Sequence, residues 1–220
     1  MRVALLGGTG DLGRGLALRL GKDTDHDLLV GSRDPERARA AAGEYETRLA
    51  EHGIDRSIGG FENGMATARS DVVVLAVSPT HLTDLLEAVG DRLQGDAIVV
   101  TPAVGIERTN AGFAYDPPPQ GSVAALVRER LPDENPVVGA FHTLPAGRLA
   151  DLSSLDMDTL VFGDSERAID RVRSLAERIE GLDSLAVGGL ENAASVESLT
   201  PLLLTLAKRN DRSDPGLKIS

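Results

Sequence analysis

The chain has 220 residues, enough for one mid-sized domain and a smaller appendage. Its 34 acidic against 23 basic side chains give a net charge of −11, which argues against nucleic acid or an anionic membrane as a partner. No cysteine is present, so disulfides and thiol nucleophiles are excluded. Because we find neither a secretion signal nor an apolar run near the ~18 residues that span a bilayer, we expect a cytoplasmic protein with no membrane partner.

The basic residues are unevenly divided between 20 arginines and 3 lysines, against 20 aspartates and 14 glutamates. An acid excess with scarce lysine is typical of a salt-adapted, halophilic-type surface. It is equally consistent with an ordinary acidic protein from a GC-rich genome. Both interpretations concern solubility and habitat rather than fold.

The first predicted element is a buried strand over residues 3–6, followed by Gly8-x-Gly10-x-x-Gly13 and a helix over residues 11–20. Strand, tight turn and helix are the context in which this glycine pattern binds a dinucleotide. Gly8 allows the turn, Gly10 lets the backbone approach a pyrophosphate, and Gly13 lets helix and strand pack closely. The positive end of the helix then faces the phosphates. The predicted contacts are Gly8, Thr9, Gly10, Asp11, Leu12 and Gly13; the alternative is a glycine-rich turn with no ligand.

The end of the second predicted strand, residues 27–31, indicates which dinucleotide is bound. NAD-preferring folds usually carry an acidic residue there, whereas this chain has Ser32 and Arg33. The Arg33 guanidinium can pair with a 2′-phosphate, and Arg37 lies one helical turn further on. Asp34 instead fits the cap of the next helix, with Pro35 at its first position. We therefore predict NADP rather than NAD; otherwise both arginines are solvated helix charges.

Strands and helices then alternate, which predicts an α/β fold with a Rossmann-type, doubly wound parallel sheet. The pattern gives helices over residues 35–52, 63–69 and 79–91, and strands over residues 57–60, 71–77 and 97–100. Residues 110–121 are polar and include three consecutive prolines, so we expect a linker or a loop over the cofactor.

The remaining elements predict a small C-terminal α/β extension. Helices are expected over residues 122–131, 165–180 and 192–209, the last with a potential kink at Pro201, and strands over residues 136–141 and 159–163. We divide the chain into a dinucleotide-binding domain, residues 1–149, and an extension, residues 150–220.

Ligands of a doubly wound sheet lie at the carboxyl ends of the strands, which adds three groups of candidates. They are Val77, Ser78 and Pro79; Ala103 and Val104; and His142, Thr143, Leu144 and Pro145. His142 is the one histidine at this edge, where it either hydrogen-bonds a ring ligand or caps a turn. The four histidines lack metal-ligand spacing, so no metal site is expected. Arg14 and Arg148 are weaker anion-binding candidates.

Four segments in this order resemble the NADP-dependent reductases of the deazaflavin coenzyme F420. They are residues 7–20 (GGTGDLGRGLALRL), 30–33 (VGSR), 142–146 (HTLPA) and 196–202 (VESLTPL), and the resemblance extends over residues 1–209. It implies hydride exchange between NADP(H) and coenzyme F420. Pyrroline-carboxylate reductases and ferric reductase domains share the fold core. The segment 78–81 departs from the more aromatic sequence typical of the family.

The resemblance also implies roles for individual residues. Thr9, Ser32, Arg33 and Arg37 would hold the 2′-phosphate, and Val77, Pro79 and Val104 would flank the adenosine and nicotinamide. The loop at residues 142–145 and the C-terminal side chains Ser195, Ser198, Thr200 and Leu203 would shape the deazaflavin pocket.

Hydride transfer between two rings needs close stacking in a dry pocket more than acid–base catalysis. His142 is accordingly the one candidate catalytic side chain, and we expect binding residues to carry the rate. Leucines at 199, 202, 203 and 206 have helical spacing, which is typical of a core, a homodimer seam or a pocket lining. The alternative functions are an NADPH-dependent reductase of a small imine or carbonyl, and a non-catalytic NADP-binding sensor.

Overall fold

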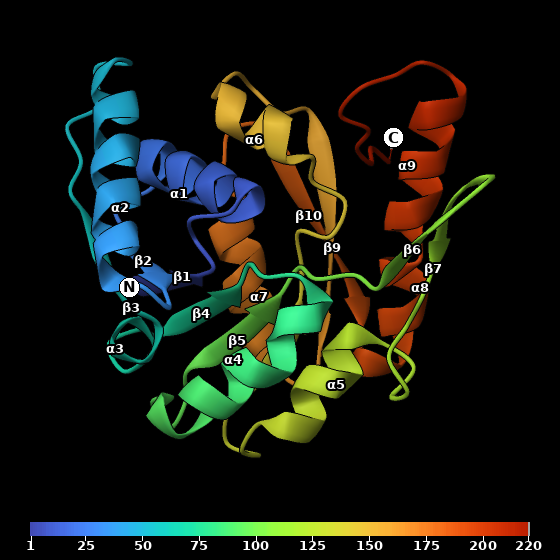
Figure 1. Ribbon diagram of the computed structural model, residues 1–220, viewed down its shortest axis with the longest axis horizontal. Coiled ribbons are helices and arrows are strands. Elements are labelled where there is room, and N and C mark those ends of the chain that lie inside the picture. Colours follow the sequence, from blue (N-terminus) through green and yellow to red (C-terminus); the bar gives the residue numbers. More distant parts are fainter. Residues whose placement is uncertain (220) are drawn as a thin grey trace.

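An eight-stranded sheet runs through the computed structural model, which describes residues 1–219 (Figure 1). Its order is β10-β9-β8-β5-β4-β1-β2-β3. Six strands are parallel: β1 (Arg2–Leu6), β2 (Asp27–Ser32), β3 (Ile58–Glu62), β4 (Val72–Leu75), β5 (Ile98–Thr101) and β8 (Val137–Gly139). The chain order reverses between β1 and β4, as in a Rossmann fold. The predicted doubly wound sheet is therefore confirmed.

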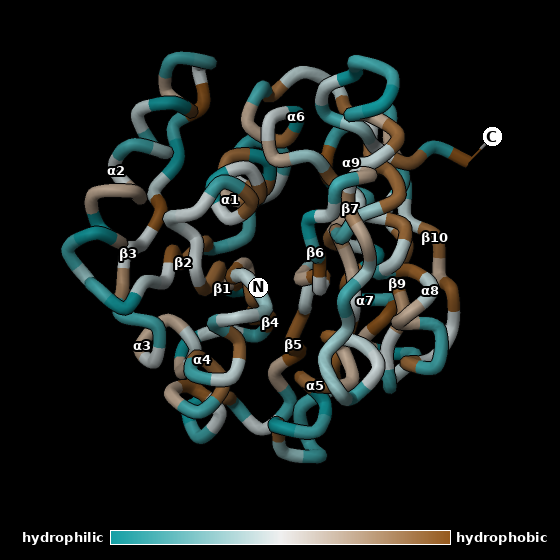
Figure 2. The backbone as a smooth tube through the Cα atoms, turned by 45° about the vertical axis from the view of Figure 1, so that its right-hand side comes forward, coloured by the Kyte–Doolittle hydropathy of each residue, from teal (hydrophilic) through white to brown (hydrophobic). Residues whose placement is uncertain are grey.

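Helices cover both faces of the sheet, and each face has its own hydrophobic core. One core packs beneath α1 (Asp11–Asp23), α2 (Pro35–Ala50), α6 (Ala146–Asp151) and α7 (Glu166–Ala176). The other packs beneath α3 (Asn63–Thr67), α4 (Leu82–Val89) and α5 (Val123–Arg130). Figure 2 shows hydrophobic residues along strands such as β5, while the helices carry both classes.

The C-terminal extension continues the same sheet in the opposite direction. β9 (Met157–Gly163) is antiparallel to β8, and β10 (Leu182–Gly188), which the sequence analysis missed, is parallel to β9. Because of this reversal, β9 begins at the edge where β1, β4, β5 and β8 end. The chain after the last helix, α9 (Leu199–Arg209), returns to that edge, where the Asp158 amide donates to the Leu217 carbonyl at 2.7 Å.

The segment predicted as a loop, residues 110–121, contains the strand β7 (Gly112–Tyr115), which forms a β-hairpin with β6 (Ile106–Thr109) just before it. Gly112 adopts a φ of +147°, which other residues rarely do. The hydroxyl of Thr205 donates to the Phe113 carbonyl and accepts from its amide, so the hairpin is fixed to the C-terminal helix. This tertiary contact explains why a polar sequence becomes two strands.

The predicted last helix is two helices, α8 (Ala193–Glu197) and α9 (Leu199–Arg209), separated at Ser198. Pro201 has no N–H to donate to the carbonyl of Glu197, so the break lies one turn before the proline rather than at it. Within residues 1–219, none of the helices combines the length and apolar character that crossing a bilayer requires. The cytoplasmic location stays a prediction.

Candidate functional site

The glycine-rich loop between β1 and α1 is tightly packed, although the residue that requires glycine for its conformation is Gly7. Gly7 has a φ of +74°, so the turn that we assigned to Gly8 depends on its neighbour. A Cβ on Gly8 would lie 2.6 Å from the Leu5 carbonyl oxygen, and one on Gly13 would lie 2.5 Å from the Gly8 Cα. Both glycines are therefore needed for close packing of loop, strand and helix.

Gly10 differs because its missing side chain faces little protein. A Cβ there would meet the Gly7 carbonyl oxygen at 3.4 Å and no other atom within 4 Å. Gly10 is also the N-cap of α1 and provides no side-chain cap for the first N–H groups of the helix. Beside it, Thr9 is half-buried, Asp11 is exposed, and Leu12 packs partly against the core. An open backbone and an uncapped helix end suit an anionic group in close contact.

The two predicted arginines lie at the carboxyl end of β2, next to the glycine loop. The Gly8 amide donates to the Gly31 carbonyl at 3.3 Å, which joins the loop to this strand end. Ser32 is buried, whereas Arg33 and Arg37 are exposed, and neither guanidinium forms an ion pair with another side chain in residues 1–219. Asp34 caps α2 by accepting the amides of residues 36 and 37, as predicted.

The candidates after β4 and β5 border the same edge. Val77 lies against the glycine loop, since a Cβ on Gly7 would be 2.5 Å from its Cγ1 atom. Pro79 begins a short 3₁₀ turn, residues 79–81, after Ser78, whose hydroxyl is 2.8 Å from that of Thr80. Ala103 and Val104 are 7% and 8% exposed, so they contribute an apolar surface with little free area.

His142 is a buried, neutral histidine with no hydrogen-bond partner for its ring. The residue is 6% exposed, and within residues 1–219 neither Nδ1 nor Nε2 finds a partner. Burial lowers its pKa to about 3, so the ring is uncharged at neutral pH. It stacks on Phe162 with the ring centroids 5.4 Å apart. The interpretation that backbone groups satisfy the ring is therefore not what the structure shows.

A small cavity of about 70 Å³ adjoins His142 and contains three further predicted residues, Thr143, Leu144 and Pro145. Its other wall comes from α9 and the C-terminal tail: Thr200, Leu203, Leu204 and Pro215. The hydroxyl of Thr200 donates to the His142 carbonyl at 2.9 Å, while the hydroxyl of Thr143 is buried and unpaired within the described chain. Pro215 was not among the predicted residues, because nothing in the local sequence marks the tail as part of a site.

Ser195 and Ser198 are not part of this cavity. Ser195 is exposed on α8, and the Ser198 hydroxyl donates to the Ser195 carbonyl at 2.8 Å. The weaker anion candidates are already engaged. Arg14 pairs with Glu44 at 3.3 Å, and Arg148 donates to the Leu155 carbonyl at 3.1 Å.

A buried arginine that was not among the predicted residues joins α1 to α6, the helix that follows the loop at residues 142–145. Arg19 of α1 is fully buried and donates to the carbonyls of Arg148 and Leu149 at 2.7 and 2.9 Å. Gly15 lets the two helices approach, since a Cβ there would be 2.6 Å from the Leu149 side chain. The chain from Gly13 to Arg19 therefore supports both halves of the site. Glycine spacing within α1 was the available signal.

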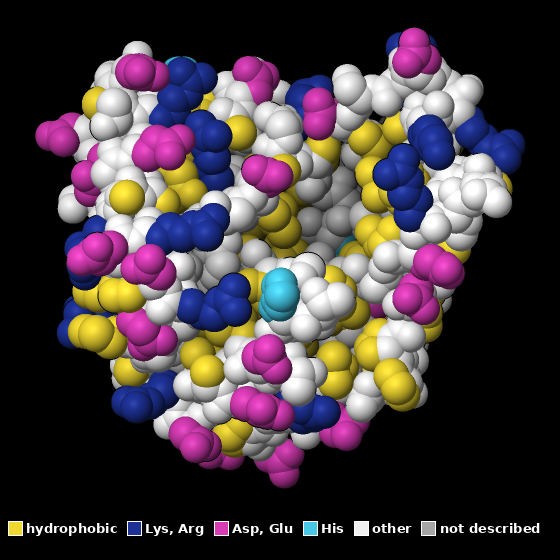
Figure 3. All heavy atoms as spheres, viewed as in Figure 1, with side chains coloured by type: hydrophobic (Ala, Val, Ile, Leu, Met, Phe, Trp, Pro, Cys, Tyr) yellow, Lys and Arg dark blue, Asp and Glu magenta, His cyan; other side chains and the backbone are white. Residues whose placement is uncertain are grey.

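One face of the molecule is hollowed. Figure 3 shows a hollow at the centre of this face, between the part built by α1 and α2 and the part built by α9 and the hairpin. Hydrophobic side chains line its walls, and basic side chains lie on both sides of it (Figure 3). Within residues 1–219, no three His, Cys, Asp or Glu side chains are grouped to hold a metal ion.

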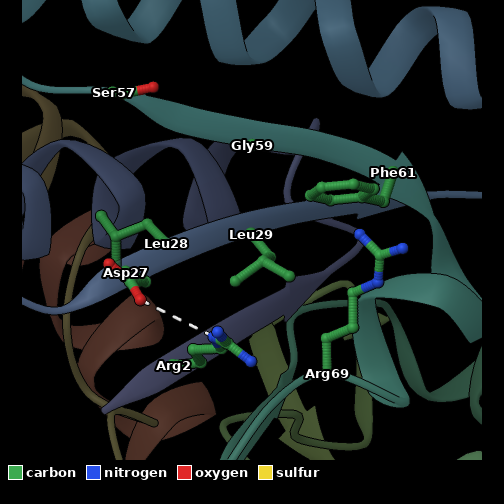
Figure 4. Close-up of a pocket in the computed structure, with 8 residues that line it drawn as sticks. All are labelled: Arg2, Asp27, Leu28, Leu29, Ser57, Gly59, Phe61 and Arg69. Carbon is green, nitrogen blue, oxygen red and sulfur yellow. Dashed lines mark ion pairs between the residues drawn. The ribbon is translucent and has the colours of Figure 1, made fainter.

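A second hollow, of about 490 Å³, lies over β1, β2 and β3, and none of the predicted site residues lines it. Arg2 and Asp27, which pair at 3.7 Å, line it together with Leu29, Phe61 and Arg69 (Figure 4). The Arg69 guanidinium stands 5.0 Å from the centre of the Phe61 ring. Arg2 and Asp27 lie where β1 and β2 begin, whereas Phe61 lies near the end of β3, in register with Gly31 of β2.

Known proteins resemble this chain over its whole length. Residues 2–105 match the family of coenzyme F420-dependent NADP oxidoreductases. The F420-dependent NADP reductase of Methanocaldococcus jannaschii is 36% identical, with 100% of this chain and 98% of the relative covered. The reductase of the same name from Methanothermobacter thermautotrophicus is 35% identical, with 100% and 95% covered.

Solved structures also resemble this chain. A structure described as a putative F420-dependent NADP reductase from Arthrobacter superposes with a TM-score of 0.81 at 25% identity, covering 100% of this chain and 99% of that one. A pyrroline-5-carboxylate reductase from Coxiella burnetii shares the fold with a TM-score of 0.61 at 15% identity, covering 95% of this chain and 67% of that one. On its full-length similarity to the curated reductases, this chain belongs to the family of coenzyme F420-dependent NADP oxidoreductases.

Proposed function

We propose that this protein is an oxidoreductase that transfers a hydride between NADP(H) and coenzyme F420. The observation that carries the proposal is the placement of two different binding surfaces on one edge of the sheet. The uncapped N-terminus of α1 and the exposed Arg33 lie on one side, and the cavity beside His142 lies on the other. A dinucleotide and a second flat coenzyme can meet there.

The dinucleotide would be held by the part of the chain before residue 150. In this proposal, the amides of residues 9–13 receive the pyrophosphate at Gly10, where a side chain would intrude on the ligand. Ser32, Arg33 and Arg37 bind the 2′-phosphate, since neither arginine has a competing carboxylate in the described chain. Val77, Pro79 and Val104 flank the adenosine and nicotinamide.

The deazaflavin would lie against residues 142–145 on one side and the C-terminal extension, residues 150–220, on the other. The unpaired polar atoms of His142 and Thr143 support this placement, because a buried donor or acceptor without a partner is costly unless a ligand or water satisfies it. Thr200 and Leu203 complete the wall of the cavity.

The two coenzyme rings would supply the hydride donor and acceptor, so the protein needs no covalent or metal chemistry. The residues at the site orient the rings and exclude water. A neutral His142 can donate one hydrogen bond and accept another but carries no charge at neutral pH, which fits positioning better than proton transfer. Transfer then depends on how closely the pocket stacks the rings.

We test this by mixing the purified protein with NADPH and oxidised coenzyme F420, at low and at multimolar salt, and following the deazaflavin absorbance. Loss of absorbance that requires NADPH, with NADH much weaker, supports the function and the 2′-phosphate site together. No loss at either salt, with NADPH binding still measurable, contradicts the proposal and favours an imine or carbonyl reductase or a sensor. The comparison of low with multimolar salt tests whether the acidic surface is of the halophilic type.

We further propose a homodimer with α9 in its interface. Leu202 and Leu206, one turn apart, are 60% and 51% exposed, which is unusual for two leucines on one helix face. A second copy that covers this face would remove both from water. The proposal rests on this exposed pair, because the structure describes a single chain.

A further inference from the structure

Tyr45 is a buried polar residue with no part in the proposed binding of either coenzyme. It lies on α2 with 2% of its surface exposed, and its hydroxyl donates to the Gly8 carbonyl at 2.7 Å. The bond joins residues 37 positions apart, and its acceptor lies in the glycine-rich loop. The helix that carries Tyr45 also carries Arg37, whose amide is capped by Asp34.

The Gly8 backbone is bonded on three sides. Its amide donates to the carbonyls of Leu5 and Gly31, at 3.0 and 3.3 Å, and its carbonyl accepts from Tyr45. These contacts connect the loop to the ends of β1 and β2 and to α2. Gly8 therefore links the predicted pyrophosphate site to the strand and the helix that carry the predicted 2′-phosphate site.

The bond from Tyr45 also fixes the direction of the next amide. The chain has no cis peptide in residues 1–219, so the carbonyl of Gly8 and the amide of Thr9 point in opposite directions. With the carbonyl held toward α2, the Thr9 amide faces away from that helix. Within the described chain, this amide donates to no backbone or side-chain acceptor.

We propose that Tyr45 is a positioning residue that holds the Gly8–Thr9 peptide so that the Thr9 amide donates to the pyrophosphate of the dinucleotide. Without the tyrosine hydroxyl, the Gly8 carbonyl is free to rotate toward the phosphate, where two oxygens would repel each other. The inference rests on the proposed function, because it assumes a dinucleotide at this loop.

The tyrosine suits this role at any pH at which the enzyme works. Burial raises its pKa to about 12, so the hydroxyl keeps its proton. Phenylalanine would fill the same space without the donor, so Tyr45→Phe removes one hydrogen bond and leaves the packing of α2 in place. Tyr115→Phe is the matched control: it also removes a hydroxyl, one that donates to Glu197 of α8 at 2.8 Å rather than to the glycine loop.

The experiment compares two ligands by calorimetric titration of the full-length parent, Tyr45→Phe and Tyr115→Phe. NADP⁺ carries both the 2′-phosphate and the pyrophosphate, whereas adenosine 2′-monophosphate carries the 2′-phosphate alone. We expect Tyr45→Phe to bind NADP⁺ about tenfold more weakly, the usual effect of one lost hydrogen bond to a constrained group. Its affinity for adenosine 2′-monophosphate should stay within about twofold of the parent, as should both affinities of Tyr115→Phe.

Steady-state kinetics give a second readout. The KM of Tyr45→Phe for NADPH should rise, whereas its kcat at saturating NADPH and its KM for coenzyme F420 should not change. Amide NMR of the parent alone gives a third, since NADP⁺ should shift the Thr9 resonance more than adenosine 2′-monophosphate does.

Three results would overturn the inference. Unchanged NADP⁺ affinity in Tyr45→Phe would make the hydroxyl purely structural, even if the variant unfolds more easily. An equal loss for both ligands would mean that Tyr45 supports α2 as a whole. Failure of the parent to bind NADP⁺ at all would instead refute the proposed function, and this inference with it.

Discussion

Acid should destabilise this protein through His142, and a variant without the histidine should lose that part of the effect. The folded ring has a pKa of about 3 because burial disfavours its charged form. Unfolding returns the pKa to about 6.5. Between these values the unfolded chain binds the proton and the folded chain does not, so stability is complete above about pH 6.5 and falls as the pH drops. From pH 7 to pH 5 the loss is about 2 kcal/mol, at about 1.4 kcal/mol per pH unit.

Urea unfolding at pH 7, 6 and 5, at one fixed salt concentration, measures this loss. The parent should lose about 2 kcal/mol more than His142→Gln over that range, because every other titrating group is common to both proteins. His52→Gln is the control, since it makes the same change of side chain at an exposed position. Equal slopes for the parent and His142→Gln would refute the reasoning, because the folded ring would then take up its proton as readily as the unfolded one.

Three further predictions test the proposed site and the dimer. Arg33→Ala should raise the KM for NADPH by about 10- to 100-fold, the value of a charge-assisted hydrogen bond to phosphate, and should leave the KM for NADH nearly unchanged; equal effects on both would remove Arg33 from the 2′-phosphate site. Replacing both Leu202 and Leu206 by glutamate should give a monomer in sedimentation velocity if α9 forms the homodimer interface, whereas an unchanged sedimentation coefficient would place the interface elsewhere. Lys218→Met removes the ion pair to Asp158 and should loosen the tail, raising the KM for coenzyme F420 but not for NADPH; limited proteolysis then checks whether the tail is cleaved sooner.

The first half of the fold follows from local sequence, because each of its elements has a local cause. Short apolar runs form β1, β4 and β5, and Asp34 with Pro35 starts α2 where capping chemistry predicts it. The carboxyl ends of parallel strands must share one edge, so topology alone gathers the glycine loop, Arg33 and His142. Local sequence patterns do not show whether a buried side chain has hydrogen-bond partners, and the ring of His142 has none in the described chain.

The second half depends on contacts between distant segments, and Asp158 explains why it was predicted less well. We expected the strand to begin at residue 159, which leaves Asp158 outside it. A carboxylate seldom lies inside a buried strand. β9 begins at Met157 instead, and Asp158 is 2% exposed. Its carboxylate accepts from the amide of Ile219 and pairs with Lys218 at 3.1 Å.

The same contacts order the C-terminal tail, whose composition alone predicts no structure. The tail satisfies the buried carboxylate of Asp158, and that requirement in turn places Pro215 in the wall of the cavity beside His142. The strand β9, with its buried carboxylate, and the C-terminal tail therefore stabilise one another. The wall that we assign to coenzyme F420 is a consequence of this pairing, so weakening it at Lys218 should change the affinity for that coenzyme before it changes the fold.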